Sequence, residues 1–362
     1  MLISHIETVP FQLPMHGELK WGKYSGFSEV RHVLVKVFLK DGAVGMAEAV
    51  PRPTIYGETV ESICHIIKHE LAPRVVGRPV EFDLFSQSLL EIKNNQTAKG
   101  AIDMALHDAV AQANGITLAD QLGVTRDTVR VSYILGVGDN DTMLAEAERV
   151  YNLGVRVLKV KIGRDWAADL ERIQLLRQIG SDLDLYVDAN ETLVYEGGAA
   201  ADRLDKLAAE GVLYCEEPLP IEQVVERADL QNGDHMPLIG DDSCFSLRDV
   251  KRELALNTFD ILNIKCARSG FTESKKMAGL AVAHDKGIMV GSQASSRLGA
   301  SRHAIFAGRP EVNHPSEVSF FLKMKSDIVA DPILLKDGYL KLSDLANIKV
   351  DDDLLKDHLL RH

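Results

Sequence analysis

The first 125 residues carry two kinds of hydrophobic pattern. Residues 32–42 and 45–50 are short runs, apolar or alternating and bounded by glycine, a pattern typical of antiparallel strands. Residues 58–71 and 98–115 instead repeat apolar residues three and four positions apart, which predicts helices, and a glycine ends the second of them. This part of the chain is therefore expected to form an α+β unit over residues 1–125.

From about residue 130 the pattern changes, and short β-branched runs alternate with helical segments. Eight such runs are candidate strands, and their regular alternation with helices predicts a (β/α)8-type barrel over residues 126–325. An open, doubly wound sheet is the alternative, but the first strand–helix turn lacks the glycine-rich dinucleotide-binding fingerprint. The candidate strands are residues 131–135, 157–163, 183–190, 211–218, 237–243, 259–265, 287–293 and 317–322.

Charged residues stand at the ends of five successive candidate strands. Taking one per strand gives Lys161, Asp188, Glu216, Asp241 and Lys265, with 24 to 28 residues from each to the next. Each gap is one strand–helix unit, so all five are expected at the C-terminal mouth of the barrel, where barrel active sites form. One such residue alone would be an ordinary helix cap or a solvated lysine. Five in phase favour a site.

The three acidic positions favour a metal site. Carboxylates on adjacent strands repel one another unless a cation binds them, and hard oxygen ligands without His or Cys favour Mg²⁺. Periodicity leaves open whether Glu216 or its neighbour Glu217, and Asp241 or its neighbour Asp242, supplies the ligand.

The lysines favour proton transfer. Lys159 and Lys161 are two residues apart on one strand and so share a face, while Lys265 lies four strands further on, across the barrel. Nearby cations are expected to lower the pKa of these lysines toward a value useful for acid–base work. Two opposed lysines beside a metal-bound carboxylate can move protons at its α-carbon, one on each face.

The strand ends resemble those of the muconate-lactonizing-enzyme subgroup of the enolase superfamily, with KVK, DAN, EEP, GDDS and NIK in the same order. The resemblance implies a capping domain of residues 1–125, completed by the tail 326–362, over the barrel. It also implies a homo-oligomer (a dimer or octamer) using Mg²⁺ or Mn²⁺. The absence of a signal peptide and of an apolar run of about 18 residues separately predicts a cytoplasmic protein. The implied metal ligands are Asp188, Glu216 and Asp241, and the implied acid/base pair is Lys161 and Lys265. Around them, Lys159 and Asn190 are expected at the substrate, with Asp242, oriented toward Lys265, and Asn263 behind the ligands.

Specificity is expected to come from the capping domain. Residues 16–27 and 49–59, glycine-punctuated and aromatic, are candidate lids. Their candidate substrate contacts are Trp21, Tyr24, Phe27 and Tyr56, each of which could equally be a packing residue. Ser295 is a further candidate, because it stands after the seventh strand where many members of the subgroup carry Glu. Phe271 and Ile134 also depart from the subgroup's pattern and leave the distal group of the substrate open.

The resemblance implies a muconate-type cycloisomerase working through an enolate of a small carboxylate. The alternative is a racemase or epimerase of N-acyl amino acids, dipeptides or proline derivatives. A dehydratase and a non-catalytic binding barrel are lesser alternatives. A net charge of −12 without a basic face argues against nucleic-acid binding. The four cysteines lie far apart, with no metal-binding pair, and no signal peptide or membrane span is evident.

Overall fold

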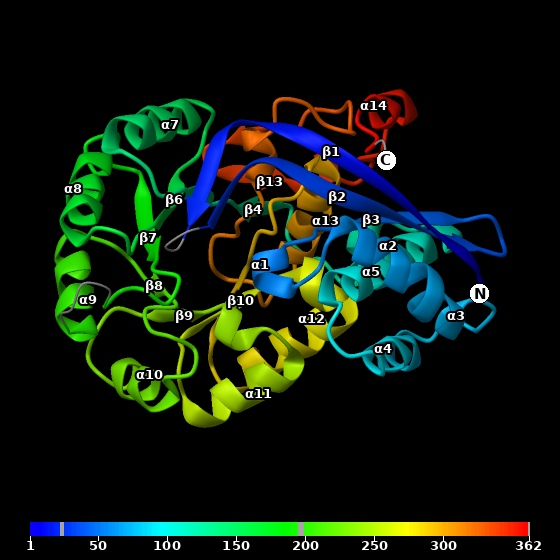
Figure 1. Ribbon diagram of the computed structural model, residues 1–362, viewed down its shortest axis with the longest axis horizontal. Coiled ribbons are helices and arrows are strands. Elements are labelled where there is room, and N and C mark those ends of the chain that lie inside the picture. Colours follow the sequence, from blue (N-terminus) through cyan, green and yellow to red (C-terminus); the bar gives the residue numbers. More distant parts are fainter. Residues whose placement is uncertain (22–24, 195–198, 361–362) are drawn as a thin grey trace.

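The computed structural model describes residues 1–21, 25–194 and 199–360 (Figure 1). Its N-terminal part is an antiparallel sheet in the order β1-β2-β3, which confirms the expected strands. β1 and β2 form a long ribbon that reaches from the N-terminal part over to the barrel (Figure 1). The three strands are β1 (Ile3–Trp21), β2 (Ser25–Leu39) and β3 (Val44–Ala49).

Helices pack beneath this sheet. The longest, α5, is buried over nearly its whole length, because it lies between β2 and β3 on one side and α12 of the barrel (Cys266–Ala283) on the other. The helix expected over 58–71 is present, but its second half is a π-helix, Ile67–Leu71. The α-helices are α1 (Pro53–Tyr56), α2 (Val60–Ile66), α3 (Ala72–Val75), α4 (Phe82–Leu90), α5 (Gln96–Ala113) and α6 (Leu118–Leu122).

The second part is a parallel barrel whose strands follow one another in chain order. Each strand pairs with the next, and the helices between them cover the outside (Figure 1). The strands are β5 (Tyr133–Leu135), β6 (Val157–Lys161), β7 (Asp184–Asp188), β8 (Cys215–Glu216), β9 (Leu238–Gly240), β10 (Ile261–Ile264) and β11 (Gly287–Val290). The helices are α7 (Asn140–Asn152), α8 (Trp166–Leu176), α9 (Ala200–Ala209), α10 (Val224–Gln231), α11 (Leu247–Leu256), α12 (Cys266–Ala283) and α13 (Arg297–Ala307).

The eighth barrel position differs from the sequence-based expectation. Residues 317–322 do not form a regular strand, and a 3-10 helix, Phe320–Lys323, takes up their second half. Ser316 and Glu317 join the two sides of the gap: Ser132 N donates to Ser316 O at 2.9 Å, and Glu317 N donates to Val290 O at 2.8 Å. Pro315 precedes them and has no N–H to extend a ladder. The barrel therefore closes through a two-residue segment.

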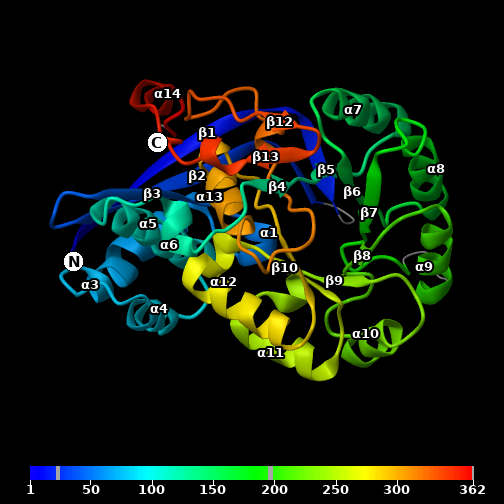
Figure 2. The same ribbon diagram turned by 180° about the vertical axis from the view of Figure 1, so that it is seen from behind.

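The C-terminal tail returns to the N-terminal sheet (Figure 2). Gln12 N donates to His358 O at 2.9 Å, and Leu360 N donates to Pro10 O at 3.1 Å. The tail also forms a small antiparallel sheet with β4, just before the barrel. Domain boundaries near residues 125 and 325 stay a prediction. The remaining elements are β4 (Thr128–Arg130), β12 (Leu335–Lys336), β13 (Tyr339–Lys341) and α14 (Asp352–Asp357).

Across the described ranges, none of the helices has the length and apolar character needed to cross a lipid bilayer.

Candidate active site

Strand register brings the predicted charged residues together at one end of the barrel. Lys161 pairs with Asp188 across β6 and β7, and Asp188 pairs with Glu216 across β7 and β8. Asp241 and Lys265 directly follow β9 and β10. A cavity with about 640 Å³ of empty space, its mouth included, opens there between the barrel and the capping-domain residues. Of the predicted site residues, its lining includes Trp21, Tyr56, Lys161, Asn190, Asp241, Asp242 and Lys265.

The two predicted acid/base lysines each contact a predicted metal ligand. Lys161 forms an ion pair with Asp188, and Lys265 forms one with Asp241. Burial alone would lower the pKa of Lys265, but the charges of Asp241 and Asp242 together outweigh burial and raise it. Carboxylates thus face the ammonium group of Lys265 and stabilise its charged form. The expected lowering of its pKa depends on a bound cation and stays a prediction.

Lys159 does not line the cavity, and its expected role at the substrate stays a prediction. The side chain is 2% exposed, and its Nζ lies 2.6 Å from Glu216 Oε1, 2.6 Å from Glu317 Oε1 and 3.0 Å from Asp188 Oδ2. Lys159 precedes the end of β6 by two residues, so its side chain lies one layer deeper than that of Lys161. It neutralises the carboxylates from within the barrel.

Glu317 is a central residue that sequence reasoning missed. Besides Lys159, it accepts hydrogen bonds from Tyr186 Oη at 3.2 Å, Asn263 Nδ2 at 3.3 Å and Ser292 N at 2.9 Å. A signal for it existed, because Glu317 stands 52 residues after Lys265, two strand–helix units further on. The irregular eighth strand concealed that phase.

The three predicted ligands offer only carboxylate oxygens, the donor set that Mg²⁺ prefers. Burial and then the charge of Asp188 raise the pKa of Glu216 well above its usual range, so a further positive charge would stabilise this group. Asn263 Nδ2, expected behind the ligands, donates to Glu216 Oε2 at 3.1 Å. As the side chains stand, no three acidic, His or Cys groups within the described ranges gather into a ready-made metal site, since lysines occupy the contacts between them. The residues present fit the ion by donor chemistry and charge.

The neighbouring acids are assigned by their contacts. Glu217 faces away from the cavity and accepts from Asp241 N at 2.6 Å, Ser243 N at 2.9 Å and Ser243 Oγ at 2.7 Å. Burial raises the pKa of Glu217 to about 7. It therefore organises the turn after β9.

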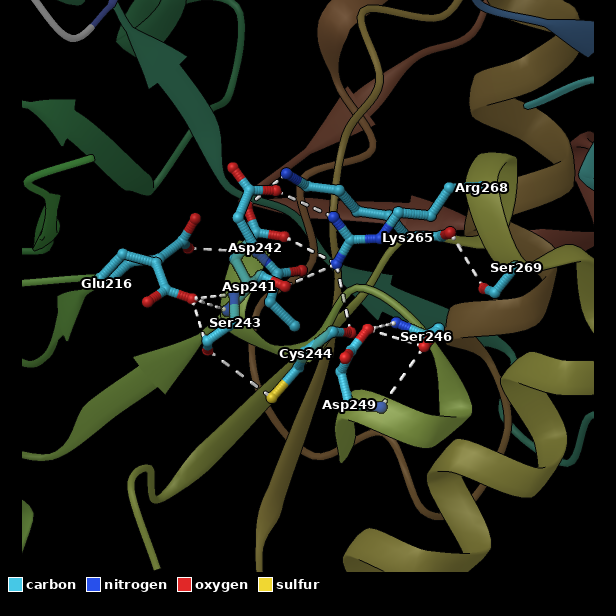
Figure 3. A network of polar contacts seen from close by, with 12 residues as sticks. Glu216, Asp241, Asp242, Ser243, Cys244, Ser246, Asp249, Lys265, Arg268 and Ser269 are labelled. Carbon is cyan, nitrogen blue, oxygen red and sulfur yellow. Dashed lines mark hydrogen bonds and ion pairs between the residues drawn. The ribbon is translucent and has the colours of Figure 1, made fainter. Parts of the chain in front are cut away.

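Asp242 pairs with Arg268 rather than with Lys265, toward which it was expected to point. Arg268 Nη1 lies 3.0 Å from Asp242 Oδ1, and Arg268 Nη2 lies 3.1 Å from Asp241 Oδ1. Figure 3 shows this guanidinium between the two aspartates and the Cys244 carbonyl. Arg268 thus holds Asp241 beside Lys265.

The remaining candidates divide between cavity and interior. The Tyr56 hydroxyl and Asn190 Oδ1 line the cavity and are buried without a hydrogen-bond partner, as expected of groups that await a ligand. Ser295 does not line the cavity, because Ala294 (φ 62°) turns the chain and directs Ser295 toward Gly299. Ser292 and Gln293 line it instead. Tyr24 lies outside the described residues.

Comparisons with known proteins identify the family of the chain. Residues 142–347 match the family "Enolase C-terminal domain-like", and residues 20–123 match "Mandelate racemase / muconate lactonizing enzyme, N-terminal domain". The crystal structure of muconate lactonizing enzyme from Mucobacterium smegmatis, complexed with muconolactone, superposes with a TM-score of 0.92. It is 32% identical and covers 100% of both chains. The chain belongs to the muconate-lactonizing-enzyme subgroup of the enolase superfamily.

Relatives within the enolase superfamily carry different activities. The L-Ala-D/L-Glu epimerase of Bacillus subtilis (strain 168) is 29% identical over 333 residues, 91% of each chain. A dipeptide epimerase from Cytophaga hutchinsonii, complexed with Mg and the dipeptide D-Ala-L-Val, shares the fold with a TM-score of 0.88 and 24% identity, covering 99% of this chain and 98% of its own. Membership of the superfamily therefore leaves the substrate open.

Proposed function

We propose that this enolase-superfamily member is a metal-dependent isomerase that works through the enolate of a small carboxylate, as a muconate-type cycloisomerase. The observation that carries the proposal is that Lys161 and Lys265 line one cavity from β6 and β10. The 32% sequence identity to the muconate lactonizing enzyme from Mucobacterium smegmatis, over the whole of both chains, supports this choice of substrate.

Asp188, Glu216 and Asp241 would hold Mg²⁺ or Mn²⁺, and the Mg in the dipeptide epimerase complex supports this assignment. When bound, the ion supplies positive charge that stabilises the negative charge developing on the substrate carboxylate. Lys161 or Lys265 delivers the proton to the carbon next to that carboxylate after the ring has closed. Arg268 holds Asp241 in place, and Lys159 with Glu317 fixes the carboxylates from below.

The second candidate is a racemase or epimerase of an amino-acid derivative. It is favoured by the presence of two cavity-lining lysines, because inversion at one carbon needs a proton acceptor on one face and a donor on the other. The 29% sequence identity to the L-Ala-D/L-Glu epimerase, over 333 residues, supports this second candidate.

Incubation in D2O with Mg²⁺ separates the two candidates. A cycloisomerase places one solvent deuteron in the lactone formed from muconate, whereas an epimerase exchanges the α-proton of N-acyl amino acids or dipeptides. We expect Lys161→Ala and Lys265→Ala each to lower the rate by about 10²- to 10⁴-fold. Lys356→Ala, at an exposed position on α14, is the control and should leave the rate unchanged. Full activity in both active-site variants would contradict the proposal, as would absence of turnover and exchange across these substrates.

A further inference from the structure

Two segments from different domains form part of the cavity rim. The capping-domain segment, residues 50–59, directly follows β3, and the barrel segment, residues 291–296, directly follows β11. Because the segments belong to different domains, their spacing depends on contacts between those domains. The residues of the two segments that line the cavity are Arg52, Ile55, Tyr56, Ser292, Gln293 and Ala294.

The barrel segment is held by a carboxylate at each end. At its start, Ser292 N donates to Glu317 Oε2 at 2.9 Å, and both residues belong to the barrel. At its end, Ser296 N donates to Glu48 Oε2 at 3.2 Å, and the Ser296 hydroxyl donates to Glu48 Oε1. Glu48 lies on β3 of the capping domain. The second end of the segment is therefore fixed from the other domain.

Glu48 makes further contacts at the start of α13. Its Oε1 accepts from Gly299 N at 2.8 Å, and an added Cβ at Gly299 would lie only 3.2 Å from Glu48 Cδ, so α13 approaches β3 closely. His32 Nδ1 lies 3.0 Å from Glu48 Oε2. Burial alone would raise the pKa of Glu48, but these contacts and those with Ser296 outweigh burial and lower it. The N-terminus of α13 also stabilises the negative charge.

A second buried carboxylate contacts the same helix from the C-terminal tail. Asp327 accepts from Arg297 N at 2.9 Å and from Val329 N at 3.1 Å. Its contacts therefore begin inside α13, whereas those of Glu48 include Ser296, the last residue of the cavity segment. The two carboxylates stabilise one helix terminus, but of the two Glu48 is the one that grips the segment lining the cavity.

We propose that Glu48 is a positioning residue, which fixes the spacing of the two rim segments and thereby holds residues 292–294 at the substrate. Among the described residues, those that line the cavity do not include Glu48, so it acts through Ser296. The inference rests on the proposed function for the chemistry in the cavity. Because a misplacement of about 1 Å can lower a catalytic rate roughly 100-fold, a residue outside the cavity can control that rate.

Glu48→Gln tests the proposal. In either orientation of the glutamine amide, its NH2 group faces a backbone N–H, that of Ser296 or of Gly299, and one anchoring contact becomes repulsive. We expect hydrogen–deuterium exchange to become about tenfold faster at the amides of Ser292 and Ala294, which donate to groups other than Glu48. The kcat/KM for muconate should fall about 10- to 100-fold. Mg²⁺ affinity, measured by calorimetry, should stay within about twofold, because the metal ligands lie apart from this contact.

Asp327→Asn is the matched control. It weakens the same end of α13, so we expect urea denaturation to show a loss of stability comparable to that of Glu48→Gln. Amide exchange at Ser292 and Ala294 and kcat/KM should nonetheless stay close to the wild-type values. Ser296→Ala removes only the hydroxyl contacts and is the milder variant that decides the question if Glu48→Gln does not fold. It should change exchange and kcat/KM in the same direction by smaller factors.

The outcomes separate this inference from the proposed function. Unchanged exchange at Ser292 and Ala294 in folded Glu48→Gln overturns the inference, even if the wild-type protein converts muconate. Faster exchange with unchanged kcat/KM also overturns it, as does an equal fall in kcat/KM in Asp327→Asn. Faster exchange in Glu48→Gln but not in Asp327→Asn, in a protein without turnover of any substrate, supports the anchoring by Glu48 while the proposed function fails.

Discussion

The two walls of the cavity differ in how their cations are paired. On the barrel side every cation faces a carboxylate, as in the pairs of Lys161 with Asp188 and Lys265 with Asp241. On the capping-domain side the guanidinium of Arg52 contacts, among the residues that the structure describes, two backbone carbonyls and an aromatic ring but no carboxylate. The paired wall is preorganised for chemistry at one carboxylate, whereas the unpaired wall is selective for what the rest of the ligand carries.

This difference also shows where each wall gets its rigidity. Parallel strand pairing fixes the barrel side, since Lys161, Asp188 and Glu216 are directly in register. The capping-domain side depends on a four-residue helix, α1, and on the end of the β1–β2 ribbon. Substrate choice can therefore change through a few side chains on that wall while the barrel chemistry stays intact.

The largest expected effect concerns the barrel-side wall, called the charged wall below because its lysines and carboxylates form ion pairs. Glu216→Gln keeps the shape of the side chain but removes the charge of the most congested carboxylate. We expect kcat/KM to fall about a thousandfold, because a metal ligand supplies several kcal/mol of transition-state stabilisation. Calorimetry with Mg²⁺ should show weakened binding, and Glu226→Gln, exposed on α10, should bind normally. Undiminished Mg²⁺ affinity in Glu216→Gln would contradict the assignment of Glu216 as a metal ligand.

A second, smaller effect tests whether Lys159, on the same wall, stabilises the fold or contacts the substrate. Lys159→Met leaves Asp188, Glu216 and Glu317 facing one another without their buried ammonium partner. We expect a loss of about 3 kcal/mol in the free energy of unfolding, as for other broken buried ion pairs. Mg²⁺ should recover part of that loss, because it supplies positive charge to the same carboxylates.

Urea denaturation with and without Mg²⁺ measures both quantities. Lys356→Met is the matched control, since its ammonium group is exposed and its ion pair contributes little. If Lys159→Met instead kept full stability and raised only KM, Lys159 would contact substrate as the family resemblance implied, and the division between the layers of the wall would be wrong.

The charged wall could be predicted because a barrel repeats. One strand–helix unit separates each of Lys161, Asp188, Glu216, Asp241 and Lys265 from the next, so periodicity alone brought them to one mouth. The same reasoning could not place depth within the barrel. Both lysines of β6 share a face, yet Lys161 lines the cavity and Lys159 lies beneath it, because the cavity floor lies between these two positions of the strand and the sequence does not show where that floor is.

The other wall could not be predicted, because its properties arise from contacts between distant segments. Arg52 is held by Gln293, which is 241 residues away, and by Phe27. Its lack of an acidic partner depends on the side chains that surround it in space. Glu317 was missed for a related reason, because Pro315 interrupts the strand that would have revealed its phase.

The smallest expected effect is on the free energy of unfolding, at the contact between the capping domain and the barrel. The same helix, α12, also provides a matched control position. At Gly270 in α12, φ is 65°, and an added Cβ would lie 2.5 Å from Asp103 Oδ2 on α5. That carboxylate accepts from Thr272 N at 2.9 Å and from Thr272 Oγ1 at 2.6 Å, which ties the capping domain to the segment after Lys265. We expect Gly270→Ala to destabilise the protein by about 2 kcal/mol through backbone strain.

Gly279→Ala, later in α12, should do the opposite. An added Cβ there meets nothing within 4 Å, so the substitution only lowers the conformational entropy of the unfolded chain. We expect it to raise the free energy of unfolding by up to about 1 kcal/mol. Urea denaturation of both variants gives the two signs in one experiment. Equal effects at the two glycines would mean that the contact between Asp103 and the Gly270 turn does not join the regions, and that the capping wall is positioned from its β1–β2 side alone.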